Sequence, residues 1–194
     1  MRRAIRRALA ALALAPGLAL AGAQQYEQLS ASVRASLARA VADPASRVPH
    51  DAWTDRWAKS VLPRVGERMK DERGARELVG LVHYEALRAG LEPRLLLALI
   101  DVESAFRKYA VSTAGARGYM QVMPFWVREI GAPGQNLFHP RTNLRYGCVI
   151  LRHYLEIEGG NLYNALARYN GSLGKPGYPE RVLDVMRARW SATP

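Results

Sequence analysis

The chain contains 194 residues, of which 49% are hydrophobic and 23% charged, and its formal net charge is +11. A chain of this length and composition can bury a hydrophobic core, which excludes a disordered protein, and we expect one modest domain with accessory segments. Because Cys148 is the only cysteine, an internal disulfide is also excluded.

The N-terminal segment, MRRAIRRALAALALAPGLALAGAQQ, has the layout of a cleavable secretory signal. Four arginines precede an apolar run of Ala and Leu that Pro16 and Gly17 interrupt, and small residues lie at two candidate cleavage points up to Ala23. The run is too short and too broken to span a bilayer comfortably, and no cysteine follows it for a lipid anchor. We predict a signal peptide over residues 1–23 and a periplasmic or exported protein; an uncleaved anchor or a buried helix is the alternative.

The net positive charge of the chain indicates which classes of partner to expect. Cleavage after Ala23 would remove four arginines and lower the formal charge from +11 to +7 (11 − 4). A basic exported protein suggests polyanionic partners such as cell-wall polymers or peripheral envelope surfaces. Nucleic acid is not expected, because no predicted helix carries a continuous basic stripe. A basic surface that serves solubility alone is the alternative.

The histidines and the cysteine offer little for a metal or a cofactor, and we predict neither. The histidines are scattered and form no close-spaced pair with each other or with Cys148, as metal ligands do. Cys148 lies in an apolar run, which favours a buried residue over a nucleophile. The four histidines are His50, His83, His139 and His153.

Downstream of the signal, apolar residues recur with a helical period and rarely with period two, which predicts a nearly all-α fold. Pro44 and Pro49 mark a linker over residues 43–50, and Pro63 should kink or split the helix that contains it. Pro93 fits the first turn of a helix. The predicted helices cover residues 26–42, 51–69, 73–88, 93–106, 124–130, 142–157, 161–170 and 180–190.

Glu103 lies near the end of a strongly apolar helix. Residues three and four apart share a helix face, so Glu103 lies on the same face as Ile100 and Leu99. Asp101, two residues away, should point to the opposite side and face solvent or pair with an arginine. Burial among Leu and Ile raises the pKa of a carboxyl group, which suits a general acid near neutral pH. On the helix alone, a structural glutamate capped by backbone N–H groups is the alternative.

The residues after this helix favour a functional role for the glutamate. Ser112 offers a hydroxyl group, and Gln121 offers an amide that both donates and accepts. Met120 and Met123 add adaptable apolar contact, and the glycines between these residues let the backbone approach a ligand closely. A polar wall with an apolar floor suits a sugar that carries an N-acetyl group.

Three short motifs follow one another in the second half of the chain. The first begins with Glu103-Ser104, continues with Ser112, and ends with GARGYMQVMP at Pro124. The second is Ala-Arg-Tyr-Asn over residues 167–170, and the third is Tyr-Pro-Glu over residues 178–180. Together they resemble the motifs of the soluble lytic transglycosylase family, and the resemblance covers about residues 80–190.

The resemblance implies a fold and an activity. The fold would be a lysozyme-like, all-α transglycosylase domain over residues 76–194, preceded by a helical extension over residues 24–75. Glu103 would be the single acid and base that cleaves the β-1,4 bond between N-acetylmuramic acid and N-acetylglucosamine of peptidoglycan, leaving 1,6-anhydromuramic ends. We also expect a monomer. The predicted sugar-site residues are Ser112, Met120, Gln121, Met123, Tyr169, Asn170, Tyr178 and Glu180, with Tyr169 close to Glu103 and positioning it.

The chain departs from the family pattern at two places. Tyr119 replaces the usual Leu of the first motif, which should narrow or re-polarise the groove. Gly171-Ser172 replaces Ala-Gly after the second motif, so the loop that leads to Glu180 should differ.

Two rival interpretations stay open. A lysozyme-type muramidase would use water and a second carboxylate, as most glycosidases do. Asp101 should point away, so Glu129 and Glu180 are the residues to consider for that second carboxylate. A non-catalytic peptidoglycan-binding envelope module would keep the fold without its chemistry, and the presence of Glu103 argues against it.

Overall fold

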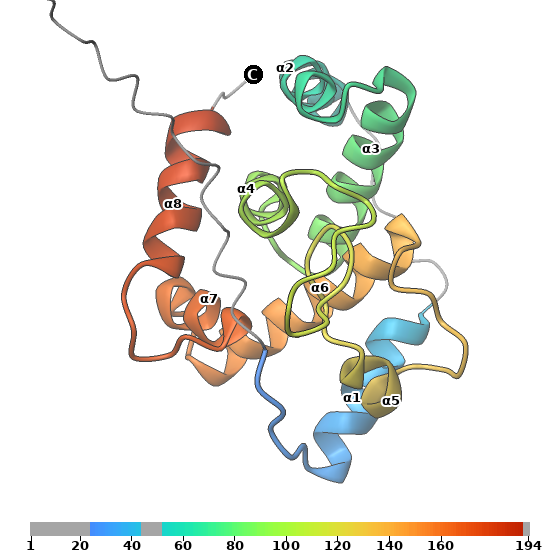
Figure 1. Cartoon of the computed structure of the whole chain (residues 1–194), viewed down its shortest axis with the longest axis vertical. Helices are drawn as coiled ribbons and strands as arrows, with labels where there is room; N and C mark the ends of the chain where they lie inside the picture. The colour runs from blue at the N-terminus through green and yellow to red at the C-terminus, as the bar shows by residue number, and fades with distance from the viewer. Residues whose placement is uncertain (1–23, 44–51, 192–194) are drawn as a thin grey trace, which may run out of the picture.

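The computed structural model describes residues 24–43 and 52–191. Within these residues every regular element is a helix, and extended pairing is limited to isolated bridges in the loop of residues 105–124 (Figure 1). The all-α prediction is therefore confirmed. The predicted signal and most of the predicted linker lie outside the described residues. The helices are α1 (Ala31–Ala42), α2 (Ala52–Met69), α3 (Glu72–Arg88), α4 (Pro93–Ser104), α5 (Phe125–Ile130), α6 (Pro140–Ile157), α7 (Leu162–Asn170) and α8 (Tyr178–Arg189).

Most predicted helix boundaries differ from the observed ones by one or two residues, and two larger differences concern the first two helices. The first helix, predicted from residue 26, begins at Ala31, because the Ser30 hydroxyl caps it and accepts a hydrogen bond from the Val33 N–H at 3.3 Å. Pro63 does not split α2, which continues through it. The helix packs on α3 through fully buried Val61 and Val65 on either side of the proline, and this packing offsets the lost backbone hydrogen bond.

Helix α4 forms the centre of the molecule. Five consecutive residues, from Leu96 to Ile100, have no exposed surface, which is typical of a helix that is covered on all sides. Helices α3 and α8 pack directly on it, and α6 joins α3 to α7 and α1 (Figure 1). A polar residue at the end of α4 is consequently surrounded by the core.

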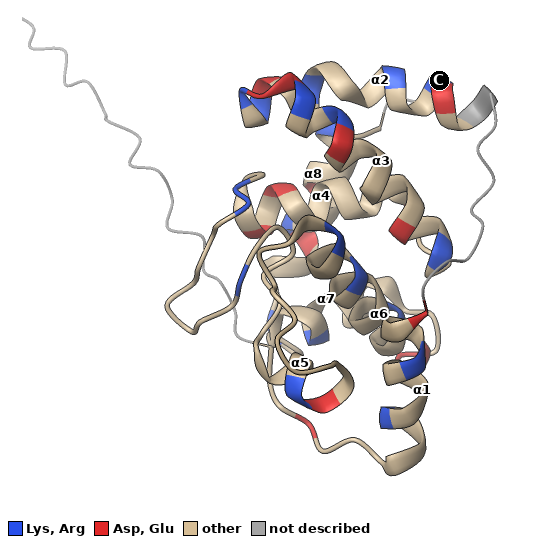
Figure 2. Cartoon of the chain, turned by 90° about the vertical axis from the view of Figure 1, so that its right-hand side faces the viewer, with Lys and Arg blue, Asp and Glu red and all other residues tan. Residues whose placement is uncertain are grey.

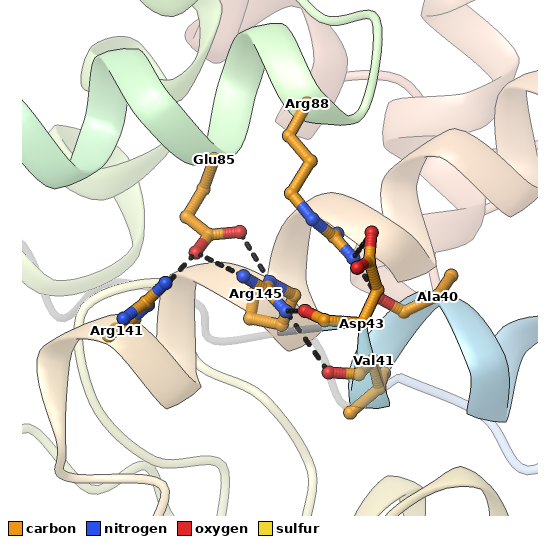
Figure 3. Close-up of polar contacts among 7 residues, drawn as sticks. All are labelled: Ala40, Val41, Asp43, Glu85, Arg88, Arg141 and Arg145. Carbon is orange, nitrogen blue, oxygen red and sulfur yellow. Dashed lines mark hydrogen bonds and ion pairs between the residues drawn. The ribbon is translucent and has the colours of Figure 1, made fainter. Parts of the chain in front are cut away.

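A buried ion pair joins α3 to α6 (Figure 3). Glu85 on α3 has no exposed surface, and its two carboxylate oxygens accept hydrogen bonds from Arg145 on α6 at 2.5 Å and 2.9 Å. Arg145 also donates to the carbonyl oxygens of Val41 and Asp43 at 3.2 Å and 2.6 Å. These oxygens belong to the C-terminal end of α1, where carbonyl groups lack partners within the helix.

A second arginine strengthens this attachment of α1. Arg88 on α3 donates to the Ala40 carbonyl oxygen and to the Asp43 carboxylate (Figure 3). Leu37 and Val41 add buried apolar contacts from α1 to the core. Helix α1 is therefore fixed to the rest of the molecule at its C-terminal end, and the residues before it extend from this anchored helix.

Charged residues are spread over several helices. Helices α1 and α7 carry only arginines, the other helices carry both signs of charge, and no helix among the described residues shows a continuous basic stripe (Figure 2). Among the described residues, no helix combines the length and the apolar character that crossing a membrane would require.

Candidate active site

The end of α4 places Glu103 inside the protein. Its side chain lies on the face shared with Leu99 and Ile100, as predicted, and the residue is only 8% exposed. The chain then reverses abruptly, because Ala105 and Phe106 both adopt positive φ angles of 48° and 62°. The carboxyl group thus lies where the helix ends and the loop of the first motif begins.

The loop of the first motif folds around its own polar side chains. Gln121, with a φ angle of 48°, donates from its amide to the carbonyl oxygens of Gly118 and Ala110 at 2.9 Å and 3.2 Å. The Ser112 hydroxyl accepts a hydrogen bond from the Ala116 N–H at 3.0 Å. Gly118 has a φ angle of 76°, and a Cβ atom there would collide with Asn143 and a backbone oxygen. The residues of the first motif therefore determine the conformation of this loop as well as the side chains that it presents.

Asn143 on α6 is a site residue that the sequence analysis missed. It is fully buried, and its Oδ1 atom accepts a hydrogen bond from the Met120 N–H at 2.7 Å. Its amide donates to the carbonyl oxygens of Arg117 and Leu137 at 2.8 Å and 2.9 Å. One side chain thus holds the motif loop at two backbone positions and the segment before α6 at a third. The available signal was an amide in the first turn of a helix whose following residues are mostly apolar.

Tyr178 is the residue whose hydroxyl reaches the glutamate. It donates a hydrogen bond to Oε1 of Glu103 at 2.5 Å, and both residues are buried. Tyr169, predicted to position Glu103, directs its hydroxyl to the Met120 carbonyl oxygen at 2.7 Å. Tyr178 therefore holds the carboxyl group, and Tyr169 holds the motif loop.

The surroundings of Glu103 favour its protonated form. Burial raises the pKa of Glu103 to about 7, while the hydrogen bond from Tyr178 and the positive charge of Arg181 act in the opposite direction without cancelling it. Burial also raises the pKa of the Tyr178 and Tyr169 hydroxyl groups, and the charge of Glu103 raises them further. A carboxyl group with a pKa near 7 can both donate and accept a proton at neutral pH.

The other carboxylates considered for the site are engaged elsewhere. Asp101 is buried on the far side of α4, where it pairs with Arg68 and, at 3.1 Å, with Arg189. The sequence left solvent or an arginine as its partner, and the structure assigns two arginines. Each of the other two candidates has a partner of its own: Glu129 pairs with Arg34 at 3.1 Å, and Glu180 accepts a hydrogen bond from Tyr163 at 3.3 Å.

The remaining predicted residues differ in how they could meet a ligand. Met120 has no exposed surface and packs against Gly147 of α6, where a Cβ atom would collide with its side chain. Met123 is half-buried, and Asn170 is buried with an amide nitrogen that has no hydrogen-bond partner. Glu180 is exposed at the start of α8. Met120 therefore packs beneath the loop, whereas the buried amide nitrogen of Asn170 still lacks a hydrogen-bond acceptor.

Cys148 is buried in α6, and burial raises the pKa of its thiol well above the ordinary value, so it has the character of a core residue. Within residues 24–43 and 52–191, no group of three or more His, Cys, Asp or Glu residues is arranged to hold a metal ion.

Comparison with known proteins relates this site to one family. The model of the transglycosylase SLT domain matches residues 80–179, just over half of the chain. Membrane-bound lytic murein transglycosylase C of Actinobacillus pleuropneumoniae serotype 5b is 40% identical over 116 residues, which are 52% of this chain and 32% of that relative. The protein of the same name from Yersinia pestis is 32% identical over 119 residues, which are 53% of this chain and 33% of that relative.

Among solved structures, an inactive mutant of lytic transglycosylase Slt from Pseudomonas aeruginosa is similar over 84% of this chain and 35% of that chain, with 20% identity and a TM-score of 0.45. The chain spans about a third of the length of the curated relatives described above. The family match includes Glu103, the loop of the first motif and Tyr178. The chain therefore belongs to the transglycosylase SLT domain family.

Proposed function

We propose that the protein is a peptidoglycan lytic transglycosylase in which Glu103 is both the acid and the base. The observation that carries the proposal is the buried carboxyl group of Glu103, which has a pKa of about 7 and accepts a hydrogen bond from Tyr178. Asp101, Glu129 and Glu180 each have a partner of their own. Family membership and the two lytic murein transglycosylases that resemble the chain support the same activity.

In the proposed reaction, protonated Glu103 gives its proton to the glycosidic oxygen between N-acetylmuramic acid and N-acetylglucosamine. The bond from this oxygen to C1 of the muramic residue breaks, and the carboxylate of Glu103 is left behind. The carboxylate then takes the proton of the C6 hydroxyl group of the same sugar, and O6 bonds to C1. No water is consumed, so no second carboxylate is needed to activate one. The attack is intramolecular and gains from proximity.

Tyr178 is suited to both halves of this reaction. Its hydroxyl is within hydrogen-bonding distance of Glu103 at the start, and the same hydrogen bond stabilises the carboxylate that forms after the first proton transfer. In this proposal Ser112, Gln121, Met123 and Asn170 line the sugar site. Met120, Tyr169 and Glu180 support them from beneath or beside the groove.

The proposal also covers location and organisation. Residues 1–23 are a signal peptide, residues 24–75 a helical extension and residues 76–194 the catalytic domain of a monomeric protein in the periplasm or outside the cell. The basic charge suits contact with peptidoglycan and with envelope surfaces.

Mass spectrometry of the products from isolated peptidoglycan tests the activity. Products with anhydromuramic ends, each one water lighter than a hydrolysis product, are expected from the wild-type protein and absent with the Glu103→Gln variant. Reducing ends would identify a muramidase instead, and peptidoglycan binding without any products would identify a binding module.

A further inference from the structure

The proposed site is almost closed to solvent. Glu103, Gln121, Tyr169 and Tyr178 are each less than a tenth exposed. A segment that covers these residues would limit how closely a polymer can approach Glu103. The candidates for movement are segments outside the helices, because the helices around the site are held by the core.

Residues 24–30, which precede α1, form one such segment, and Gln24 is its most buried residue. It is only 4% exposed, although it lies in irregular chain seven residues before α1 begins. Its side-chain oxygen accepts a hydrogen bond from the backbone N–H of Met123 at 3.2 Å. Its side-chain nitrogen is buried, and a hydrogen bond from the Gln24 side chain lowers the pKa of the Tyr169 hydroxyl, against the larger effect of burial. The carboxamide therefore lies between two residues assigned to the proposed sugar site or its support.

Leu29, just before the cap of α1, packs against the core, whereas two other contacts of this segment lie nearer the surface. The ring of Tyr26 meets Phe125 edge to face at 5.6 Å, and Glu27 pairs with Arg168 at 2.9 Å. Both Tyr26 and Glu27 are exposed, and exposed ion pairs contribute little to stability. Arg168 also pairs with Glu158, so it keeps a partner when Glu27 leaves. The C-terminal end of α1, in contrast, is fixed by the network of Figure 3.

We propose that residues 24–30 form an active-site strap, in which the Gln24 carboxamide occupies the place of an acetamido group of the glycan, and that the glycan binds by displacing the strap. The proposal rests on the proposed function. A carboxamide and an acetamido group present the same planar pair, a carbonyl acceptor and an N–H donor. An acetamido group presents a carbonyl acceptor to the Met123 N–H and an N–H donor to the Tyr169 hydroxyl, so it competes with Gln24 for the same two partners. Helix α1 keeps the displaced strap attached to the molecule.

Gln24→Ala tests the strap, and Gln25→Ala is its matched control, because Gln25 is the same residue type and is exposed. Both variants are made in the full chain, and the mass of each purified protein is measured to check that all have the same N-terminus. Amide hydrogen exchange, measured by NMR, should show faster exchange of the Met123 N–H in Gln24→Ala and no change in Gln25→Ala. Equal protection in all three proteins would mean that Gln24 does not hold this amide, and it would overturn the proposal.

Ligand affinity tests competition. With Glu103→Gln added to prevent turnover, calorimetry with N-acetylchitotriose should give an affinity about three- to tenfold higher for Gln24→Ala, the range expected when one competing hydrogen bond is removed. Gln25→Ala should match the parent. An unchanged affinity would overturn the strap, and a weaker one would overturn it by identifying Gln24 as a sugar contact.

The two proposals fail differently. Anhydro products from the wild-type protein, with no gain in oligosaccharide affinity or in KM for peptidoglycan when Gln24 is replaced, would leave the activity standing and remove the strap. Absence of products from the wild-type, Gln24→Ala and Gln25→Ala proteins would remove both proposals. Products that form with a lower KM in Gln24→Ala alone would support both.

Discussion

Two buried glutamates meet opposite surroundings in this protein. Glu85 has no exposed surface and receives two hydrogen bonds from Arg145, and the pKa of Arg145 is raised by this partner even though burial lowers it. Glu103 is nearly as buried, but a neutral tyrosine hydroxyl is its hydrogen-bond partner and its pKa is raised to about 7. Burial alone therefore does not make an acid catalyst.

The two glutamates differ in the group that compensates the negative charge of the carboxylate. Arg145 offers a planar fork that fits both oxygens of Glu85, so the ionised pair is stable in the core and can hold α1, α3 and α6 together. At Glu103 no such fork is present, and the group avoids the cost of a buried charge by holding a proton. The first arrangement suits structure, and the second suits proton transfer.

Replacing the catalytic candidate should give the largest effect. Glu103→Gln removes the group that we propose donates and accepts the proton, so we expect the rate of product release from peptidoglycan to fall by about 10³-fold or more. Glu129→Gln, which changes a carboxylate paired with Arg34, is the control and should retain most activity. A Glu103→Gln protein with substantial activity would contradict the assignment.

Breaking the structural pair should affect stability instead. Arg145→Met removes both hydrogen bonds of buried Glu85, leaves only the longer ion pair with Arg141 at 3.8 Å, and should lower the free energy of unfolding by about 3–5 kcal/mol. The double variant Glu85→Leu with Arg145→Met should recover a large part of this loss, because no unpaired charge is left. Urea denaturation followed by circular dichroism measures both, and equal losses in the single and double variants would count against an unpaired charge as the cause.

The raised pKa of Glu103 also predicts a pH dependence of stability. Between the ordinary glutamate pKa of 4.5 and about 7, the folded state binds more protons at this group than the unfolded state does. The stability that this group contributes is therefore fully present below 4.5 and is lost as the pH rises through 7, by up to about 3 kcal/mol. Glu103→Gln should be more stable than the wild type at pH 8 and equal to it near pH 4. Denaturation at both pH values checks the sign.

The two site tyrosines should separate in a pH–rate profile. Tyr178→Phe removes a hydrogen bond that lowers the pKa of Glu103, so the alkaline limb of kcat/KM should move to higher pH. Tyr169→Phe removes a hydrogen bond to Met120 and should lower the rate without moving the limb. The shift expected for Tyr178→Phe is the smallest of the expected effects, less than about one pH unit. Identical shifts in the two variants would mean that neither hydroxyl acts on Glu103 specifically.

Local sequence patterns were enough to predict some features of this site. The spacing of Leu99, Ile100 and Glu103 on one helix places the carboxyl group on the buried face and Asp101 on the other. The positions of most helices follow from the same periodicity and from proline and glycine signals.

Other features depend on contacts between residues far apart in the chain. The partner of Glu103 is 75 residues away, and the residue that meets the Met123 N–H is 99 residues away. Asn143 bonds the motif loop from 23 residues beyond Met120. No periodicity encodes such pairs, because they depend on how the helices pack.

The attachment of α1 has a consequence for how this domain can be moved between proteins. The family match covers residues 80–179, but Arg145 and Arg88 inside it take carbonyl oxygens of α1 as acceptors, and most of α8 lies beyond it. A transplanted segment cut at the limits of the match would carry two arginines without these acceptors and an exposed side of α4. A portable version of this domain therefore has to begin before α1 and end after α8.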